Sequence, residues 1–197
     1  MSFSELDCIK RVKKGDDNAF SELVDSYQSA VYNLCYRMIG NPQEAEDAAQ
    51  ETFWRAYKNL DRYDTRRSFA TWLLSIAAHY CIDQQRRRKL PTIDLDDILE
   101  YGPIDTLPNP EHAVIQSEYI DLVQGQLAHL NPKDRAVLVL RYWYEMSEEE
   151  ICNTLNISKS AVKSRLHRAR QNMAEQWLSS QGDSAFTERR QHEPQTI

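Results

Sequence analysis

The chain has 197 residues, 41% of them hydrophobic and 27% charged, and its formal net charge is -6 at pH 7. This composition is that of an ordinary globular protein, and it contains no run of the roughly 18 to 20 apolar residues that a membrane-spanning helix needs. The negative charge does not exclude a nucleic-acid partner, because a locally basic face still neutralises phosphates on a protein that is acidic on average.

The four cysteines are scattered along the chain without a Cys-x-x-Cys pair. With no basic-then-apolar leader at the N-terminus, this usage predicts a protein of the reducing cytoplasm that is not inserted into a membrane. His79 and Cys81 are two residues apart and do not share a helix face, so we expect no metal site and no cofactor. A catalytic function has little support, since the sequence has no glycine-rich phosphate loop and no His-Glu-x-x-His motif.

Apolar residues recur every three or four positions, alternating strand patterns are absent and only 5 glycines occur. The pattern predicts an all-α fold of two small helical domains joined by an extended acidic linker. The first domain covers residues 1–89. It contains a turn at "IGNPQEAED", where Gly40 suits the end of one helix and Pro42 the first turn of the next.

The last helix of the first domain, "RSFATWLLSIAAHYCIDQQRRRK", places Trp72 at helical spacing among other apolar residues and ends in four cations. The loop before it, "LDRYDTRRSF", sets Tyr63 beside Arg66 and Arg67. Aromatic rings among arginines are typical of surfaces that bind single-stranded nucleic acid. The alternatives are that the aromatic rings belong to the core and that the terminal cations complement the helix dipole.

Residues 90–113 carry six acidic residues, four prolines and no lysine or arginine. This composition predicts an extended strap, for which a solvated linker is the simplest interpretation. The segment 179–197, "SSQGDSAFTERRQHEPQTI", has too little apolar content to pack and is predicted to be a disordered tail.

The second domain, residues 114–178, has the start signals of three helices. Pro132 begins one, Ser147 and Glu150 form a capping box for the next, and after the short turn "NIS" Ser158 caps a third. The third helix buries a stripe at spacings of four, three and four, made of Val162, Leu166, Ala169 and Met173. Its opposite face carries Ser160, Ser164, His167 and Gln171, flanked by Lys163 and Arg168.

The stretch "SKSAVKSRLHRAR" within this helix holds five basic residues and no acidic one. Two helices joined by a tight turn, the second presenting hydrogen-bonding side chains between cations, form the arrangement of a helix-turn-helix that reads the DNA major groove. The alternative is that these cations merely solvate the exposed side of an ordinary helix.

The stretches "VKKGDDNAFSELVDSY", "AEDAAQETFWRAY" and "FATWLLSIAAHYCIDQQRR", followed by the helix-turn-helix, resemble the extracytoplasmic-function sigma factors of bacterial RNA polymerase. The resemblance covers nearly the whole chain. It implies a first domain that docks on the polymerase and melts the minus-ten promoter element, and a second domain that reads the minus-thirty-five element in duplex form. It also implies that the acidic strap follows the polymerase cleft and imitates nascent RNA.

The resemblance implies three groups of site residues. The polymerase-binding positions are Asp47, Gln50, Glu51 and Phe53, although Phe53 fits the core equally well. The minus-ten positions are Tyr63, Arg66, Arg67, Trp72, His79, Asp83, Arg86 and Arg87; His79 departs from the family, which often has asparagine there. The minus-thirty-five positions implied by the resemblance are Lys163, Ser164, His167 and Arg168. The helical-wheel assignment gives the same face and adds Ser160.

The partners implied are core RNA polymerase, promoter DNA in duplex and single-stranded form, and an anti-sigma factor. A free-standing helix-turn-helix regulator is the alternative function. Such regulators usually dimerise on palindromic sites, and the sequence has no obvious dimer stripe.

Overall fold

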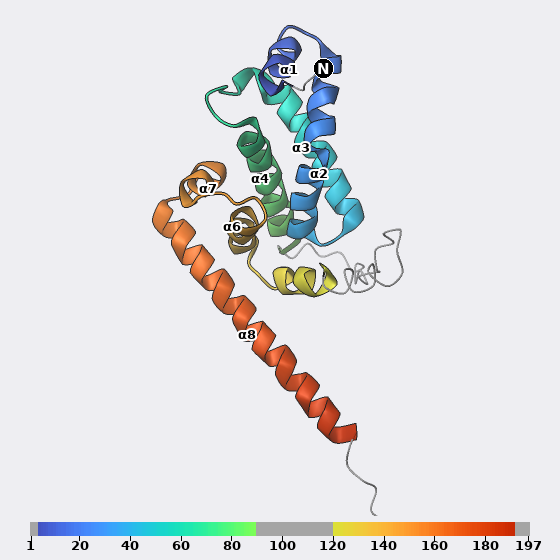
Figure 1. Ribbon diagram of the computed structural model, residues 1–197, viewed down its shortest axis with the longest axis vertical. Coiled ribbons are helices and arrows are strands. Elements are labelled where there is room, and N and C mark those ends of the chain that lie inside the picture. Colours follow the sequence, from blue (N-terminus) through green and yellow to red (C-terminus); the bar gives the residue numbers. More distant parts are fainter. Residues whose placement is uncertain (1–3, 90–119, 192–197) are drawn as a thin grey trace, which may run out of the picture.

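The computed structural model describes residues 4–89 and 120–191 of the chain (Figure 1). Every regular element in these two ranges is helical, so the predicted all-α class is confirmed. The elements are α1 (Glu5–Val12), α2 (Asp17–Ile39), α3 (Pro42–Asn59), the short 3-10 helix η1 (Leu60–Arg62), α4 (Phe69–Lys89), a helical segment at residues 120–128, α6 (Pro132–Tyr142), α7 (Glu148–Leu155) and α8 (Lys159–Gln191). The predicted acidic linker, residues 90–113, lies outside the described residues.

The turn between α2 and α3 has the predicted geometry. Gly40 ends α2 in the left-handed region with φ 88°, and its amide donates to the Tyr36 carbonyl at 2.8 Å. Asn41 then caps α3 by accepting from the Glu44 amide at 3.1 Å, with Pro42 in the first turn. A left-handed residue without a Cβ is what reverses the chain here.

In the first domain, α2, α3 and α4 pack against one another, and α1 packs on α2. Phe69 is 1% exposed and lies edge-on to Tyr27 and to Tyr63, with ring centroids 5.4 and 5.5 Å apart. The beginning of α4 is therefore held in place by an aromatic cluster.

In the second domain, α6 and α7 both pack against α8. The capping box between Ser147 and Glu150 is present. Ser158 accepts from the Ala161 amide at 3.2 Å, and Asn156 turns the chain between α7 and α8 with φ 52°. The predicted stripe is also confirmed: Val162, Leu166 and Ala169 are buried and Met173 is half-buried.

The two domains share one hydrophobic core, a contact that the sequence patterns did not predict. Helix α6 packs against α2 and α4 as well as α8, and α7 packs against α4 (Figure 1). Buried residues from both domains, such as Leu34 and Leu73 from the first and Val137 and Ile151 from the second, belong to the same apolar cluster.

Helix α8 continues well beyond the helix-turn-helix and projects away from the rest of the structure (Figure 1). Its backbone is helical as far as Gln191, which differs from the disordered tail predicted for residues 179–197. Once a packed helix exists, each added residue only has to propagate it, and propagation is far less costly than nucleation. Residues 192–197 lie outside the described part of the chain.

Two glycine substitutions should change stability in opposite directions. We expect Gly40→Ala to lower the free energy of unfolding by about 1 to 2 kcal/mol, because a Cβ is strained at this positive φ. Gly125→Ala should raise it by about 0.5 to 1 kcal/mol, since Gly125 lies in the helical segment 120–128 and an added Cβ meets nothing within 4 Å. Urea unfolding followed by circular dichroism measures both, and a stabilising Gly40→Ala would contradict the turn geometry.

Candidate nucleic-acid interface

Two neighbouring concavities lie between α3 and α4. The first, about 420 Å³, is lined by Arg55, Asn59, Arg62, Trp72, Ser75, Ile76 and His79. The second, about 330 Å³, is lined by Arg55, Tyr80, Asp83, Gln84, Arg87 and Arg88. We call the two together the α3–α4 groove. It brings together four of the predicted minus-ten residues, namely Trp72, His79, Asp83 and Arg87, since they recur at helical spacing along one face of α4.

Arg55 lines both halves of the groove and was missed by the sequence analysis. Its Nε donates to Glu51 Oε1 at 2.7 Å, and its guanidinium lies 4.7 Å from the centroid of the Tyr80 ring. Asn59 and Arg62 line the same concavity. The spacing of four and seven residues from Arg55 in "RAYKNLDR" is a helical signal that could have indicated this cationic edge.

His79 is exposed on α4, and the structure indicates its tautomer. Its Nδ1 lies 2.7 Å from the Ser75 carbonyl oxygen. A carbonyl oxygen only accepts hydrogen bonds, so Nδ1 carries the hydrogen and Nε2 of the neutral ring is left as an acceptor. In its neutral form, His79 therefore offers one acceptor atom, Nε2, to a ligand.

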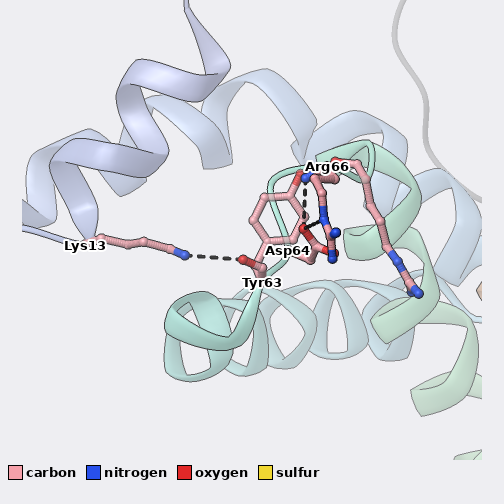
Figure 2. A network of polar contacts seen from close by, with 5 residues as sticks. Lys13, Tyr63, Asp64 and Arg66 are labelled. Atoms are coloured by element: carbon pink, nitrogen blue, oxygen red, sulfur yellow. Dashed lines mark hydrogen bonds and ion pairs between the residues drawn. The ribbon is translucent and has the colours of Figure 1, made fainter.

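The loop between η1 and α4 is supported by Tyr63 (Figure 2). Tyr63 is 4% exposed; its hydroxyl donates to the Arg67 carbonyl and its ring lies 4.9 Å from that of Trp72. Lys13 Nζ reaches the Tyr63 carbonyl at 3.3 Å. Burial leaves Tyr63 without an open ring face, so it holds the loop and Trp72 in place and does not present its own ring to a base.

Asp64 organises the cationic part of the loop (Figure 2). Arg66 donates to it from Nη2 at 2.8 Å and from its backbone amide at 3.0 Å. These hydrogen bonds, with the side chain contributing most, lower the pKa of Asp64 to about 2. The Arg66 side chain remains 88% exposed, so it stays accessible while Asp64 restricts its orientation.

The remaining predicted minus-ten residues do not line the groove. Arg67 is exposed in the loop. Arg86 is exposed near the C-terminal end of α4 and lies 3.8 Å from Asp83. Arg88, which was not predicted, pairs with Glu44 of α3.

The face of α3 beyond the groove carries the predicted polymerase-binding residues. Asp47 and Gln50 are exposed and Glu51 is partly exposed, whereas Phe53 is only 9% exposed and belongs to the core. Trp54 was not predicted, yet it is 53% exposed. Its ring stacks with Tyr57 at an interplanar angle of 15°, and Lys58 Nζ lies 4.3 Å from its centroid. Trp54 follows Gln50 by four residues and so shares its face.

The helix-turn-helix presents the predicted minus-thirty-five residues on one side of α8. Ser160, Lys163, Ser164, His167 and Arg168 are all exposed. Lys163 lies 4.0 Å from Glu148 of α7, and the Ser160 hydroxyl lies 3.0 Å from that of Ser158. The arrangement is a short polar face between cations, of a size that the major groove accepts.

A buried carboxylate ties this recognition helix to α6. Asp134 is 6% exposed and accepts from Arg165 Nη1 at 2.6 Å and from Arg168 Nε at 3.2 Å. Arg168 thus positions α8 with part of its guanidinium, while its side chain remains 53% exposed.

Two further expectations concern absences. Within residues 4–89 and 120–191, no three His, Cys, Asp or Glu side chains are grouped as metal ligands. Searched over the same two ranges, no helix is long and apolar enough to cross a bilayer.

Comparison with known proteins identifies the family. The family model described as Sigma-70 region 2 matches residues 23–90, and the one described as Sigma-70, region 4 matches residues 120–173. The chain is 44% identical over 177 residues to the ECF RNA polymerase sigma factor SigW of Bacillus subtilis (strain 168), covering 85% of this chain and 94% of that protein. This chain belongs to the ECF sigma factors. The predicted resemblance is confirmed, and membership supports the sigma function over a free-standing regulator.

Other relatives agree with this assignment. The sigma factor is 32% identical over 170 residues to the RNA polymerase sigma-H factor of Pseudomonas aeruginosa, covering 83% of this chain and 88% of the other. Its fold is similar to that of CnrH in complex with the cytosolic domain of CnrY, with a TM-score of 0.64, 24% identity and coverage of 87% and 96%. The fold is also similar to that of the sigma factor RpoE of Bartonella quintana, solved with the anti-sigma factor NepR. The TM-score is 0.63 at 20% sequence identity, and the match covers 79% of this chain and 94% of that one.

Each candidate surface of this sigma factor falls within one of the two family matches. The α3 face, the α3–α4 groove and the loop fall within the region 2 match, and the helix-turn-helix falls within the region 4 match. The predicted fold of two helical domains, the second a helix-turn-helix, is therefore confirmed.

The loop ion pair of the sigma factor should be visible in an acid titration. Because the folded pKa of Asp64 is depressed, the pair stabilises the loop above the ordinary value of 3.8 and is lost as the pH falls towards about 2. Carboxyl-carbon NMR should show Asp64 titrating near 2 in the wild type. In Arg66→Gln we expect the midpoint to return towards 3.8; an unchanged midpoint would mean that Arg66 is not the cause.

Removing the buried carboxylate should loosen the recognition helix. We expect Asp134→Ala to lower the free energy of unfolding by about 2 kcal/mol, since Arg165 and Arg168 lose a charged acceptor while staying partly solvated. The exposed Asp121→Ala serves as the control and should change it by less than about 0.5 kcal/mol. Equal effects in thermal unfolding would show that the Asp134 cluster does not support α8.

Proposed function

We propose that this sigma factor is an adaptor without chemistry or a cofactor of its own. It binds core RNA polymerase in the cytoplasm, melts the minus-ten element with its first domain and reads the minus-thirty-five element with its second. One observation carries the proposal: a cationic groove with aromatic walls and a helix-turn-helix face are exposed on the same chain. The first suits unstacked bases and the second suits duplex DNA.

For polymerase docking, we assign Asp47, Gln50 and Glu51 as the polar contacts and Trp54 as the apolar anchor in place of the buried Phe53. A tryptophan exposed among polar side chains has the composition of an interface hot spot. Lys58 and Tyr57 hold its ring before the partner arrives, which reduces the entropy lost on binding.

For the minus-ten element, we propose that the α3–α4 groove binds the separated non-template strand. Trp72 offers its ring for stacking, and His79 accepts a hydrogen bond from a base amino group through Nε2. Phosphates are bound along the cationic edges by Arg55, Arg62, Arg66, Arg67, Arg86 and Arg87, with Asp83 orienting Arg86. Tyr63 acts from beneath by supporting Trp72. Stacking and phosphate contacts together offset the few kcal/mol that unstacking each base costs.

For the minus-thirty-five element, Ser164 and His167 lie at the centre of the exposed face of α8, where base edges are within reach of a helix in the major groove. Ser160 and Lys163 flank them towards the start of the helix, and Arg168 contributes a phosphate contact besides its bond to Asp134. An anti-sigma factor is a further proposed partner, because the family resemblance implies one.

The decisive experiment is transcription in vitro with bacterial core polymerase and a random promoter library, with and without the protein, at stated salt. We expect new start sites that share two spaced elements, and loss of selection at the upstream element in Lys163→Ala. No new start sites, combined with tight duplex binding in the absence of polymerase, would favour the free-standing regulator.

The substitution Arg55→Gln tests whether the α3–α4 groove binds phosphate. Removing one phosphate contact should lower the slope of log affinity against log salt by about one unit for promoter complexes. The exposed Lys10→Gln on α1 removes the same charge outside the groove and should leave the slope unchanged. If Arg55→Gln instead weakens core polymerase binding at an unchanged slope, Arg55 serves only to orient Glu51.

A further inference from the structure

The loop between η1 and α4 is tied to α1 by a lysine side chain. Lys13 Nζ donates to the Tyr63 carbonyl at 3.3 Å and lies 3.5 Å from the Asp61 carbonyl oxygen (Figure 2). Both oxygens lie where η1 ends and the loop begins. An ammonium group has three donors and a carbonyl oxygen only accepts, so this cation suits two converging carbonyls. The start of the loop is therefore held from a helix about fifty residues earlier in the chain.

Helix α1 provides a fixed base for this contact. Ile9 is 0% exposed, and the Lys13 amide donates to the Ile9 carbonyl at 3.1 Å. The Arg11 guanidinium donates to Glu22 of α2 at 2.9 Å, and Glu5 accepts from the hydroxyl of Tyr27, also on α2. The backbone of Lys13 is thus anchored on the first domain, while its long side chain extends to the loop.

Tyr63 connects the tied backbone to the proposed minus-ten surface. It is 4% exposed, its hydroxyl donates to the Arg67 carbonyl, and its ring lies 4.9 Å from that of Trp72. The next residue, Asp64, accepts from Arg66 Nη2 at 2.8 Å. A displacement of the Tyr63 backbone would therefore move the ring that supports Trp72 and the carboxylate that orients Arg66.

Lys13 does not line the α3–α4 groove. We propose that it is a positioning residue for minus-ten recognition: it fixes the loop over residues 63–68, and the preference for minus-ten bases depends on this tie. The inference rests on the proposed function and adds a residue of α1 to it. A loop that is fixed before DNA arrives loses less conformational entropy on binding, and it rejects bases that fit only a shifted loop.

The test compares substitutions at two neighbouring lysines in the full-length chain. Lys13→Met removes the ammonium group and keeps an unbranched stem. Lys14→Met is the matched control, because Lys14 is also exposed and its loss changes the net charge by the same amount. Lys13→Arg should restore the tie, since a guanidinium also offers several donors to carbonyl oxygens.

Amide hydrogen exchange of the free proteins, followed by NMR, gives the first result. The Arg66 amide donates to the Asp64 side chain and the Arg67 amide to the Asp64 carbonyl, both at 3.0 Å. We expect these two amides to exchange about fivefold faster in Lys13→Met, the factor that one hydrogen bond is worth, and at the wild-type rate in Lys14→Met and Lys13→Arg. Unchanged exchange in Lys13→Met would overturn the tie. Equal acceleration throughout the first domain would overturn a role confined to the loop.

Transcription in vitro with core polymerase gives the second result. The template is a promoter that the wild type uses, randomised in turn at each of its two elements. We expect Lys13→Met to weaken the preference among minus-ten bases by about fivefold and to leave the minus-thirty-five preference unchanged. Lys14→Met and Lys13→Arg should retain both preferences.

Three other outcomes are distinguishable. A uniform loss of transcription in Lys13→Met, with the minus-ten preference intact, would overturn the positioning role. So would a fall of about one unit in the salt slope with the preference intact, because Lys13 would then bind a phosphate. A wild type that initiates nowhere would overturn the proposed function and with it the role in base preference, and hydrogen exchange would still decide whether Lys13 holds the loop.

Discussion

Helix α6 is enclosed on nearly every side, because α8 covers one face and α2 and α4 cover the other. A helix in such a position has to be apolar all round, and "AVLVL" meets that requirement. The two charges that precede this run, Asp134 and Arg135, are each bonded to a different neighbour: α8 for the first, the end of α2 for the second. The position of the recognition helix relative to the first domain depends on these contacts.

Ion pairs orient cations on both of the proposed DNA-binding surfaces. Glu51 holds Arg55 at the groove, Asp64 holds Arg66 in the loop, and Asp134 holds Arg168 on the recognition helix. Exposed ion pairs add little to stability, so in the proposed function their value lies in restricting long side chains before a phosphate is bound. This is how a chain of net charge -6 presents basic surfaces without an excess of cations.

Helical spacing was sufficient to predict which side chains of α8 share a face, because that property depends only on positions within one helix. It placed Ser164 beside His167. Spacing could not tell that Tyr63 is covered by its own loop. It also could not show that Trp54 is the exposed aromatic residue of α3, since exposure depends on which neighbouring helix covers each face.

By itself the sequence determined the all-helical class, the capping signals around Gly40 and Ser147, and the two faces of the recognition helix. These features arise from contacts between residues a few positions apart, and such contacts are written directly in the order of the residues. Only the tertiary structure decided that α6 closes the two domains onto each other and that Arg55 meets Tyr80 across the groove. The reason is that an apolar face or an unsatisfied carbonyl shows in the sequence only that a partner is needed. Which residue becomes the partner depends on packing between segments that lie up to about a hundred residues apart in the chain.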